Sequence, residues 1–226
     1  MAPRIGIVVF PGTNCEHDAA VALGALGAQT TYLWHTDATL DGVEAVVIPG
    51  GFAHGDYVRP GAIARFSPVM GAVAAFAQAG GPVVGICNGF QVLCEAGLLP
   101  GALQKNAGRT FLCQHTELVV SSTSSVLTGA ATLGQRLVLP INHFSGSYVC
   151  DAATLSELRA SDRVVLRYVA NPNGSIDDIA GVANEAGNVV GLMPHPERAS
   201  AAILGSTDGL VLLSGLLASV RVAVSP

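Results

Sequence analysis

The sequence predicts an α/β fold with an open, mostly parallel sheet flanked by helices. Two observations lead to this prediction. Short apolar runs typical of buried strands alternate with helical segments through the first half of the chain. Glycine turns follow two of these runs directly, Gly50-Gly51 after Ile48 and Gly85–Gly89 around Ile86. Because open parallel sheets bind ligands at the carboxyl ends of their strands, both turns are candidate functional loops.

The first half begins with a strand and a helix. Residues 5–10 form a short apolar run that ends at Pro11-Gly12. Thr13 with Glu16 three residues later predicts a capping box that opens a helix to about Leu26, where Gly27 ends it. The further elements expected in this half are strands at 31–34, 45–48 and 83–86, a helix at 69–78, and a helix that starts just after Cys87.

The second half carries more strands and tight turns. The turns are expected at 171–174 and 185–188, and an amphipathic helix at 210–220 closes the chain. The strands are expected at 117–120, 136–139, 164–169, 179–183 and 189–192.

Composition limits the possible classes. Of the 226 residues, 50% are hydrophobic and 12% charged, which suits one compact domain spanning residues 1–226. The net charge of -5 without basic clusters argues against nucleic-acid binding. Five cysteines without Cys-x-x-Cys spacing argue against a disulfide framework or a metal site, and favour the reducing cytoplasm. Residues 66–94 lack charge, but Gly80-Gly81-Pro82 interrupts them, so no membrane span is expected.

The most informative motif is Gly85-Ile86-Cys87-Asn88-Gly89, between an apolar run and a helical segment. Gly-x-nucleophile-x-Gly at a strand-to-helix turn is a nucleophile elbow. Glycines leave room for the strained turn that lifts the thiol clear of the sheet. We therefore expect Cys87 to be exposed at a helix N-terminus, where the helix dipole favours the reactive thiolate. The other four cysteines, Cys15 among them, are expected to be small core residues.

A base for this nucleophile is available in Met193-Pro194-His195-Pro196-Glu197. Prolines on both sides predict an extended segment, in which residues two apart point the same way. Cys87, His195 and Glu197 then have the composition of a nucleophile, base and orienting carboxylate. Backbone N–H groups at Gly50-Gly51 and at Asn88 are candidates for stabilising an oxyanion.

Together these motifs resemble the class I (triad-type) glutamine amidotransferases. Further motifs narrow the resemblance to the branch of glutaminase subunits that serve a synthase of purine biosynthesis, and the similarity covers nearly the whole chain. The motifs that carry the resemblance are 10–18 (FPGTNCEHD), 50–52 (GGF), 55–59 (GDYVR), 85–91 (GICNGFQ), 171–175 (NPNGS) and 193–199 (MPHPERA).

The resemblance implies a class I amidotransferase fold and a glutaminase reaction through a thioester on Cys87, with His195 as acid and base and Glu197 fixing its tautomer. It assigns oxyanion and glutamine binding to five further residues. These are Gly50, Gly51, Phe52, Asn88 and Gln91.

The same resemblance implies partners. Ammonia would pass to an ATP-dependent synthetase subunit, with a small third subunit in many bacteria, that converts formylglycinamide ribonucleotide to its amidine. ATP and magnesium are expected on that partner, because this chain lacks a phosphate-binding loop and holds a single lysine, Lys105.

The sequence also departs from the pattern of the family. Ser145 stands where glutamate is expected and His54 where tyrosine is typical. Two alternatives remain open: a cysteine hydrolase or chaperone of the DJ-1/PfpI type, which shares an elbow cysteine, and a non-catalytic assembly protein. The roles of Arg59, His143 and Arg198 are not assigned by these patterns.

Overall fold

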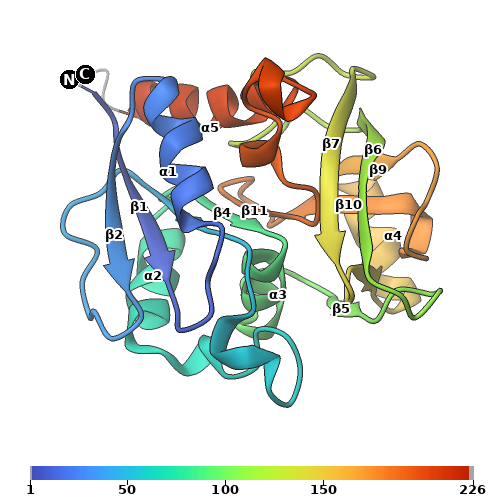
Figure 1. Cartoon of the computed structure of the whole chain (residues 1–226), viewed down its shortest axis with the longest axis horizontal. Helices are drawn as coiled ribbons and strands as arrows, with labels where there is room; N and C mark the ends of the chain where they lie inside the picture. Colours follow the sequence, from blue (N-terminus) through green and yellow to red (C-terminus); the bar gives the residue numbers. More distant parts are fainter. Residues whose placement is uncertain (1, 224–226) are drawn as a thin grey trace.

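A central sheet of nine strands runs through the molecule in the computed structural model, which describes residues 2–223 (Figure 1). The strand order is β2-β1-β3-β4-β11-β10-β9-β6-β7, and β5 and β8 form a separate pair. The strands are β1 (Arg4–Val9), β2 (Gln29–Trp34), β3 (Ala45–Ile48), β4 (Val83–Ile86), β5 (Ala102–Gln104), β6 (Leu112–Val120), β7 (Arg136–His143), β8 (Ser147–Val149), β9 (Val164–Tyr168), β10 (Ile179–Ala183) and β11 (Val189–Leu192).

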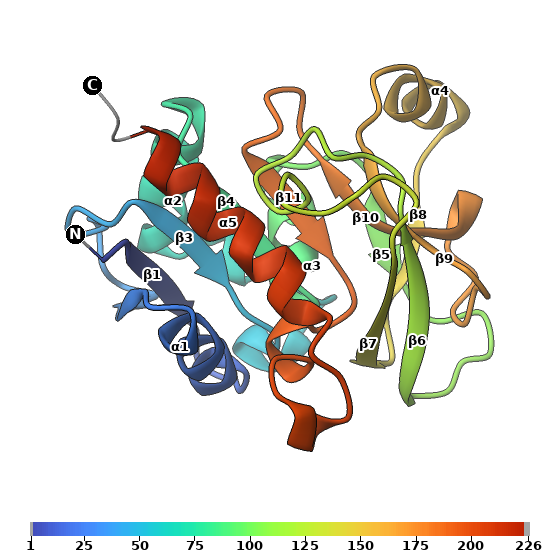
Figure 2. The same ribbon diagram turned by 90° about the horizontal axis from the view of Figure 1, so that it is seen from above.

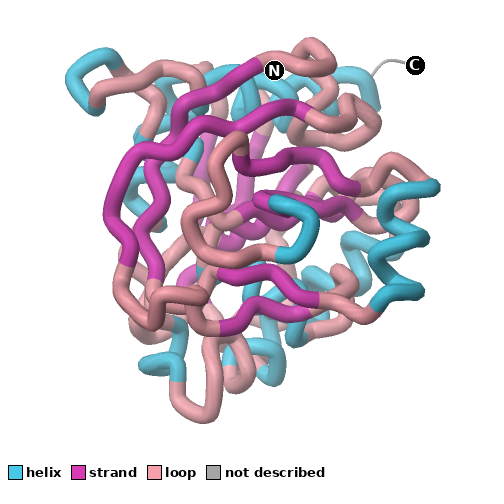
Figure 3. Tube along the Cα trace, turned by 90° about the vertical axis from the view of Figure 1, so that its right-hand side faces the viewer, coloured by secondary structure: helices cyan, strands magenta, loops and turns pink. Residues whose placement is uncertain are grey.

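The helices pack around the central sheet, as Figure 3 shows. Helices α1 and α2 cover opposite faces of the sheet, and the view from above makes this plain (Figure 2). The helices are α1 (Glu16–Ala25), α2 (Pro68–Gln78), α3 (Asn88–Glu95), α4 (Ala152–Ala160) and α5 (Gly209–Ala223). The predicted α/β fold with an open sheet flanked by helices is therefore confirmed.

The sheet has a parallel part and an antiparallel part. Neighbouring strands are parallel from β2 through β1, β3 and β4 to β11, whereas β10, β9, β6 and β7 continue the sheet antiparallel. Strands β3 and β4 consist of Ala, Val, Gly and Ile and are buried along their whole length, as expected for strands covered on both faces. Parallel β4 and β11 end side by side, since Leu192 pairs with Ile86.

The start of α1 differs from its prediction. The helix begins at Glu16, one residue after Cys15, and no side chain caps it. The Thr13 hydroxyl instead accepts a hydrogen bond from the Phe10 N–H (2.9 Å), and Thr13 forms a β-bridge with Gly51. Thr13 thus ties the first loop to the loop after β3, and the predicted capping box is wrong.

One α-helix and two strands of the structure are absent from the sequence-based prediction. Helix α4 begins at the N-cap Asp151, whose carboxylate accepts from the Thr154 N–H (2.8 Å). Strands β5 and β8 are three residues long and pair only with each other.

In the described part of the chain, none of the helices has both the length and the apolar character needed to cross a membrane.

Candidate active site

Cys87 occupies the turn between β4 and α3 in a strained backbone conformation, with φ +52° and ψ -105°. The neighbouring glycines have no room for a side chain. A Cβ on Gly89 would lie 1.8 Å from the Ile48 carbonyl oxygen, and one on Gly85 would lie 2.6 Å from the Gly89 oxygen. The predicted strand, turn and helix at Cys87 therefore exist, and the two glycines are sterically required.

The thiol itself is buried, so the prediction of an exposed Cys87 is wrong. Only 5% of the residue is exposed, because the end of β7 lies across it, with the Asn142 carbonyl oxygen 3.8 Å from the sulfur. Cys87 instead forms part of the wall of a cavity of about 740 Å³. A substrate would reach the sulfur through this cavity.

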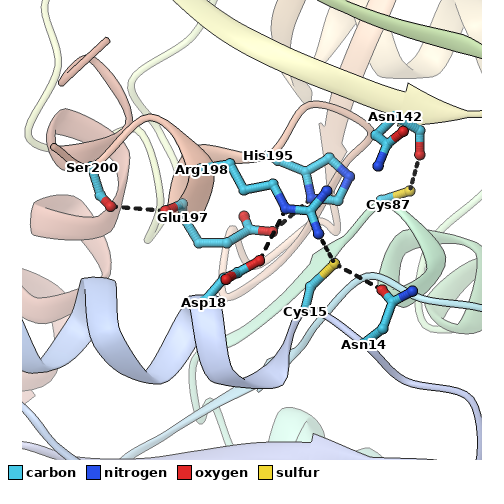
Figure 4. Close-up of polar contacts among 9 residues, drawn as sticks. All are labelled: Asn14, Cys15, Asp18, Cys87, Asn142, His195, Glu197, Arg198 and Ser200. Carbon is cyan, nitrogen blue, oxygen red and sulfur yellow. Dashed lines mark hydrogen bonds and ion pairs between the residues drawn. The ribbon is translucent and has the colours of Figure 1, made fainter. Parts of the chain in front are cut away.

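His195 reaches Cys87 because the chain leaves β4 and β11 at the same edge of the sheet. His195 and Glu197 are both almost fully buried, and the His195 Nδ1 lies 2.6 Å from the Glu197 Oε1. In Figure 4 the imidazole lies between Glu197 and Cys87. The structure thus brings the three predicted catalytic residues together.

The local geometry of this segment differs from the prediction. His195 is extended, with φ -103° and ψ 92°, but Pro196–Arg198 forms a 3₁₀ helix. Proline fixes φ near the helical value as readily as it fits an extended chain, and here the helical turn is formed. The contact between His195 and Glu197 is made by this turn and not by an extended segment.

The surroundings of His195 favour its protonated form. Burial by itself lowers the pKa of the imidazole, but the Glu197 carboxylate, followed by the sulfurs of Cys87 and Cys15, raises the pKa of His195 well above its ordinary value. The Nε2 atom is buried and has no hydrogen-bond partner in the described part of the chain. A proton on His195 is thus held next to Cys87, which lines the cavity.

The predicted oxyanion and substrate residues occupy three different positions. Gly51, Phe52 and Gln91 line the cavity. Gly50 lies close to two of the predicted catalytic residues, since a Cβ on it would be 2.8 Å from the His195 Cε1 and 3.5 Å from the Cys87 Cβ. The Asn88 side chain is buried outside the cavity wall.

Asn88 joins the walls of the cavity through hydrogen bonds. Its Oδ1 accepts from the Ala53 N–H (3.0 Å), and its Nδ2 donates to Gln91 (2.8 Å) and to Asp56 (3.2 Å). Gln91 in turn donates to the Ser145 carbonyl oxygen (2.5 Å). Because this last contact uses a backbone oxygen, serine in place of the expected glutamate at 145 leaves it intact.

Two further residues of the site, Cys15 and Arg198, are not identified as such by sequence reasoning. The Cys15 sulfur lies 3.2 Å from an Arg198 guanidinium nitrogen and 3.2 Å from the Asn14 Oδ1, and Arg198 also donates to Asp18 at 3.0 Å (Figure 4). The one sequence feature that could have identified them is their position inside the motifs 10–18 and 193–199, on which the resemblance rests.

Cys15, His195 and Glu197 also form a group that could be interpreted as a metal site, since one donor atom from each lies within 4.8 Å of the others. The closest pair in this group is already a 2.6 Å hydrogen bond between His195 and Glu197. That hydrogen bond, with His195 also facing Cys87, is the arrangement of a base with its orienting carboxylate.

His143 and His54 belong to the cavity region but not to the catalytic group. Burial, followed by the charge of His195, lowers the pKa of His143 to about 4, which keeps it neutral near pH 7. Its Nδ1 lies 3.0 Å from the Asn106 Oδ1. His54 Nε2 lies 3.4 Å from the Ser67 hydroxyl.

Comparison with known proteins places this geometry in a family. Residues 2–207 match the CobB/CobQ-like glutamine amidotransferase domain. A protein of Rubrobacter xylanophilus named phosphoribosylformylglycinamidine synthase subunit PurQ is 56% identical, covering 97% of this chain and 100% of the relative. The PurQ subunit of Koribacter versatilis is 51% identical over 95% of this chain and 97% of its own length.

Comparison with solved structures gives a result consistent with the sequence relatives. A chain in the structure of PurLQS from Thermotoga maritima superposes with a TM-score of 0.90 at 43% identity, covering 97% of this chain and 99% of that one. A Thermoplasma acidophilum protein described as part of a GMP synthase has a TM-score of 0.68 at 15% identity, covering 99% and 96%, and shares the fold. The chain belongs to the PurQ family of glutamine amidotransferases.

Proposed function

We propose that this chain is the glutaminase subunit of a phosphoribosylformylglycinamidine synthase, with Cys87, His195 and Glu197 as its catalytic residues. The observation that carries the proposal is the arrangement of three side chains, of which Cys87 lines the cavity. Glu197 hydrogen-bonds a buried His195, and that imidazole faces a cysteine on a strained strand-to-helix turn. The PurQ relatives that are 56% and 51% identical to this chain, over 97% and 95% of its length, support the proposal.

The proposed reaction has two halves. The Cys87 sulfur attacks the side-chain amide carbon of glutamine, and His195 donates its proton to the nitrogen, which leaves as ammonia. Water then attacks the resulting thioester, His195 takes a proton from that water, and glutamate leaves as the thiolate is restored. Glu197 holds the imidazole in one orientation and stabilises its charged form.

The remaining predicted residues have roles in binding. Backbone N–H groups of Gly51 and Asn88 are proposed to stabilise the tetrahedral oxyanion. Gly50 leaves the space in which His195 and Cys87 meet. Phe52 and Gln91, on the cavity wall, are proposed to contact the bound glutamine.

The product requires a partner. Ammonia released into water near pH 7 would take up a proton and lose its nucleophilic lone pair, so it must be passed on within a complex. We propose that the partner is an ATP-dependent synthetase subunit, PurL, with the small subunit PurS. ATP and magnesium would bind the partner and not this chain. We further propose that residues 1–226 form one domain, whose core cluster extends from Ile5 to Val220, and that it works in the cytoplasm.

The decisive experiment compares nitrogen sources in the reconstituted complex. Cys87→Ala is expected to abolish synthesis from glutamine and to leave synthesis from ammonia unchanged. Equal retention of both activities would refute the proposal and leave the chain with an assembly role only.

Covalent labelling separates the proposal from the DJ-1/PfpI alternative. Diazo-oxo-norleucine, a glutamine analogue, is expected to modify Cys87 of the complex, as mass spectrometry of peptides would reveal, and glutamine should slow the modification. Labelling that is absent, or that glutamine does not slow, would favour the alternative.

A further inference from the structure

The rim of the cavity includes a loop held in an unusual backbone conformation. Four residues between Ala53 and Val58 have positive φ angles, and three of them are not glycine: His54 (φ +54°), Asp56 (φ +54°) and Val58 (φ +69°). Each costs conformational energy that the surrounding structure must offset. Such strain is concentrated at functional sites more often than elsewhere.

Asn88 holds this loop at two points. Its side chain accepts from the Ala53 N–H at the start of the loop and donates to the Asp56 carboxylate at 3.2 Å. Asn88 directly follows Cys87 in the sequence, so the carboxylate has a fixed place relative to the nucleophile. The strained loop therefore presents one negatively charged group to the cavity.

The Asp56 carboxylate has no cationic partner among the described residues. The nearest basic residue along the chain, Arg59, is paired with Glu95 through two contacts of 2.5 and 2.7 Å. Burial raises the pKa of Asp56 to about 6, and the hydrogen bond from Asn88 offsets this only in part. A half-buried carboxylate without a counter-ion is unfavourable until a cation binds beside it.

The lining of the same cavity also carries positive charge. Lys105 and Arg109, which follow β5, line the same cavity, and the Lys105 Nζ lies 5.8 Å from the centroid of the Phe144 ring. An acidic group and basic groups from separate segments of one cavity lining match the zwitterionic end of an amino acid, whose ammonium and carboxylate are both charged near pH 7.

We propose that Asp56 is the specificity-determining residue that binds the α-ammonium group of glutamine. This inference rests on the proposed function and adds a recognition contact to it. Asn88 positions the carboxylate, while Gln91, which Asn88 also contacts, remains a neutral group of the wall. The alternative is that Asp56 only braces the loop.

Two substrates distinguish recognition from bracing. L-Glutamine and 4-carbamoylbutanoate have the same amide and carboxylate, but the second lacks the α-amino group. In the reconstituted complex, Asp56→Asn should lower kcat/KM for glutamine about 10- to 100-fold, mainly through KM, because a charge-assisted hydrogen bond is lost. It should change kcat/KM for 4-carbamoylbutanoate by about twofold or less. If that compound turns over too slowly, its inhibition constant against glutamine replaces kcat/KM.

Asp162→Asn is the matched control, because Asp162 is also an aspartate with positive φ (+53°). Unlike Asp56, it is exposed and does not line the cavity. It should leave both substrates unaffected. An equal loss for both substrates on Asp56→Asn, or no loss for either, would overturn the inference. If the unmodified complex hydrolysed neither compound, the glutaminase proposal itself would fail, and the recognition proposal with it.

The pH dependence supplies a second readout. The preference for glutamine over 4-carbamoylbutanoate should fall as the pH drops through about 6, because Asp56 loses its charge, and Asp56→Asn should make the preference independent of pH. The ratio of the two substrates cancels the titration of the shared catalytic groups. The charged or titratable groups near Asp56 are His54, Tyr57 and Arg59 on its own loop, Glu95 on α3, and Cys87, Lys105, Arg109 and His143 in the lining of the cavity.

Discussion

Two buried cysteines, each on its own loop, lie beside His195. Cys87 is on the turn after β4, has a positive φ and lines the cavity. Cys15 is the N-cap residue that precedes α1, with φ -110°, and its sulfur contacts Asn14 and Arg198. A Cβ on Gly50 would lie 3.0 Å from the Cys15 sulfur and 3.5 Å from the Cys87 Cβ, so both residues approach the same small space.

The difference shows which features set Cys87 apart as the proposed nucleophile. Both cysteines are buried and both are close to a base, so neither burial nor proximity separates them. Cys87 has a substrate-sized cavity in front of it, whereas the Cys15 sulfur is engaged by neighbouring polar groups and lies outside the cavity wall. Four substitutions test this contrast, from the largest expected effect to the smallest.

Cys87→Ala removes the proposed nucleophile. Glutaminase turnover of the complex should fall about 10,000-fold, because the loss of a nucleophile removes most of the catalysis that a triad provides. Steady-state assay of glutamate release measures it, and the melting temperature should stay within a few degrees. A loss below tenfold would mean that another residue, with Cys15 as the first candidate, attacks the amide.

Gly89→Ala tests the steric requirement of the Cys87 turn. The new Cβ would overlap the Ile48 carbonyl oxygen at 1.8 Å, and we expect a loss of more than about 4 kcal/mol in the free energy of unfolding. Urea denaturation measures this change. Gly24→Ala is the control, since nothing lies within 4 Å of its Cβ and alanine favours a helix, so it should stabilise α1 slightly. Similar behaviour of the two variants would show that the turn tolerates a side chain.

Glu197→Gln keeps the shape of the carboxylate but removes its charge. Glutaminase turnover should fall about 100- to 1,000-fold, because the amide no longer fixes the imidazole tautomer or stabilises its charged form. The pKa of His195 should also drop, since burial then acts with less opposition, and NMR titration of the imidazole would detect it. An unchanged pKa would remove Glu197 from its proposed role.

Cys15→Ala should have the smallest effect. We expect a decrease of about tenfold or less in kcat with KM unchanged, because Arg198 retains its contact with Asp18. Diazo-oxo-norleucine should still label the variant at Cys87. A loss as large as that of Cys87→Ala would place Cys15 in the chemistry and end the contrast between the two cysteines.

Local signals in the sequence predict the parts of the site that depend on neighbouring residues. The glycines around Cys87 and the close spacing of His195 and Glu197 both act within a few residues, so their patterns are readable. Asp56 is not, because its role depends on a cavity built from distant segments. The expectation that Cys15 is a core residue agrees with its burial, but the sequence does not reveal its contact with Arg198.

The elements of the fold also separate into those that local sequence patterns predict and those that they do not. Strands β3, β4, β10 and β11 have the predicted bounds or lie within one residue of them, because each is a short apolar run. The pairing of β4 with β11 joins segments about a hundred residues apart, and only the structure places them together. Helix α4 is absent from the prediction although Asp151 and Thr154 carry a cap signal, since its apolar face is narrow: Leu158 is its buried residue.

Lys105 is the only lysine in the sequence, and it lies on the wall of the cavity that leads to Cys87. A reagent selective for primary amines therefore meets a single side-chain target in this chain. A fluorescent group attached there would sit on the wall of the cavity proposed to bind glutamine, and its emission could follow substrate arrival directly, without a second engineered site.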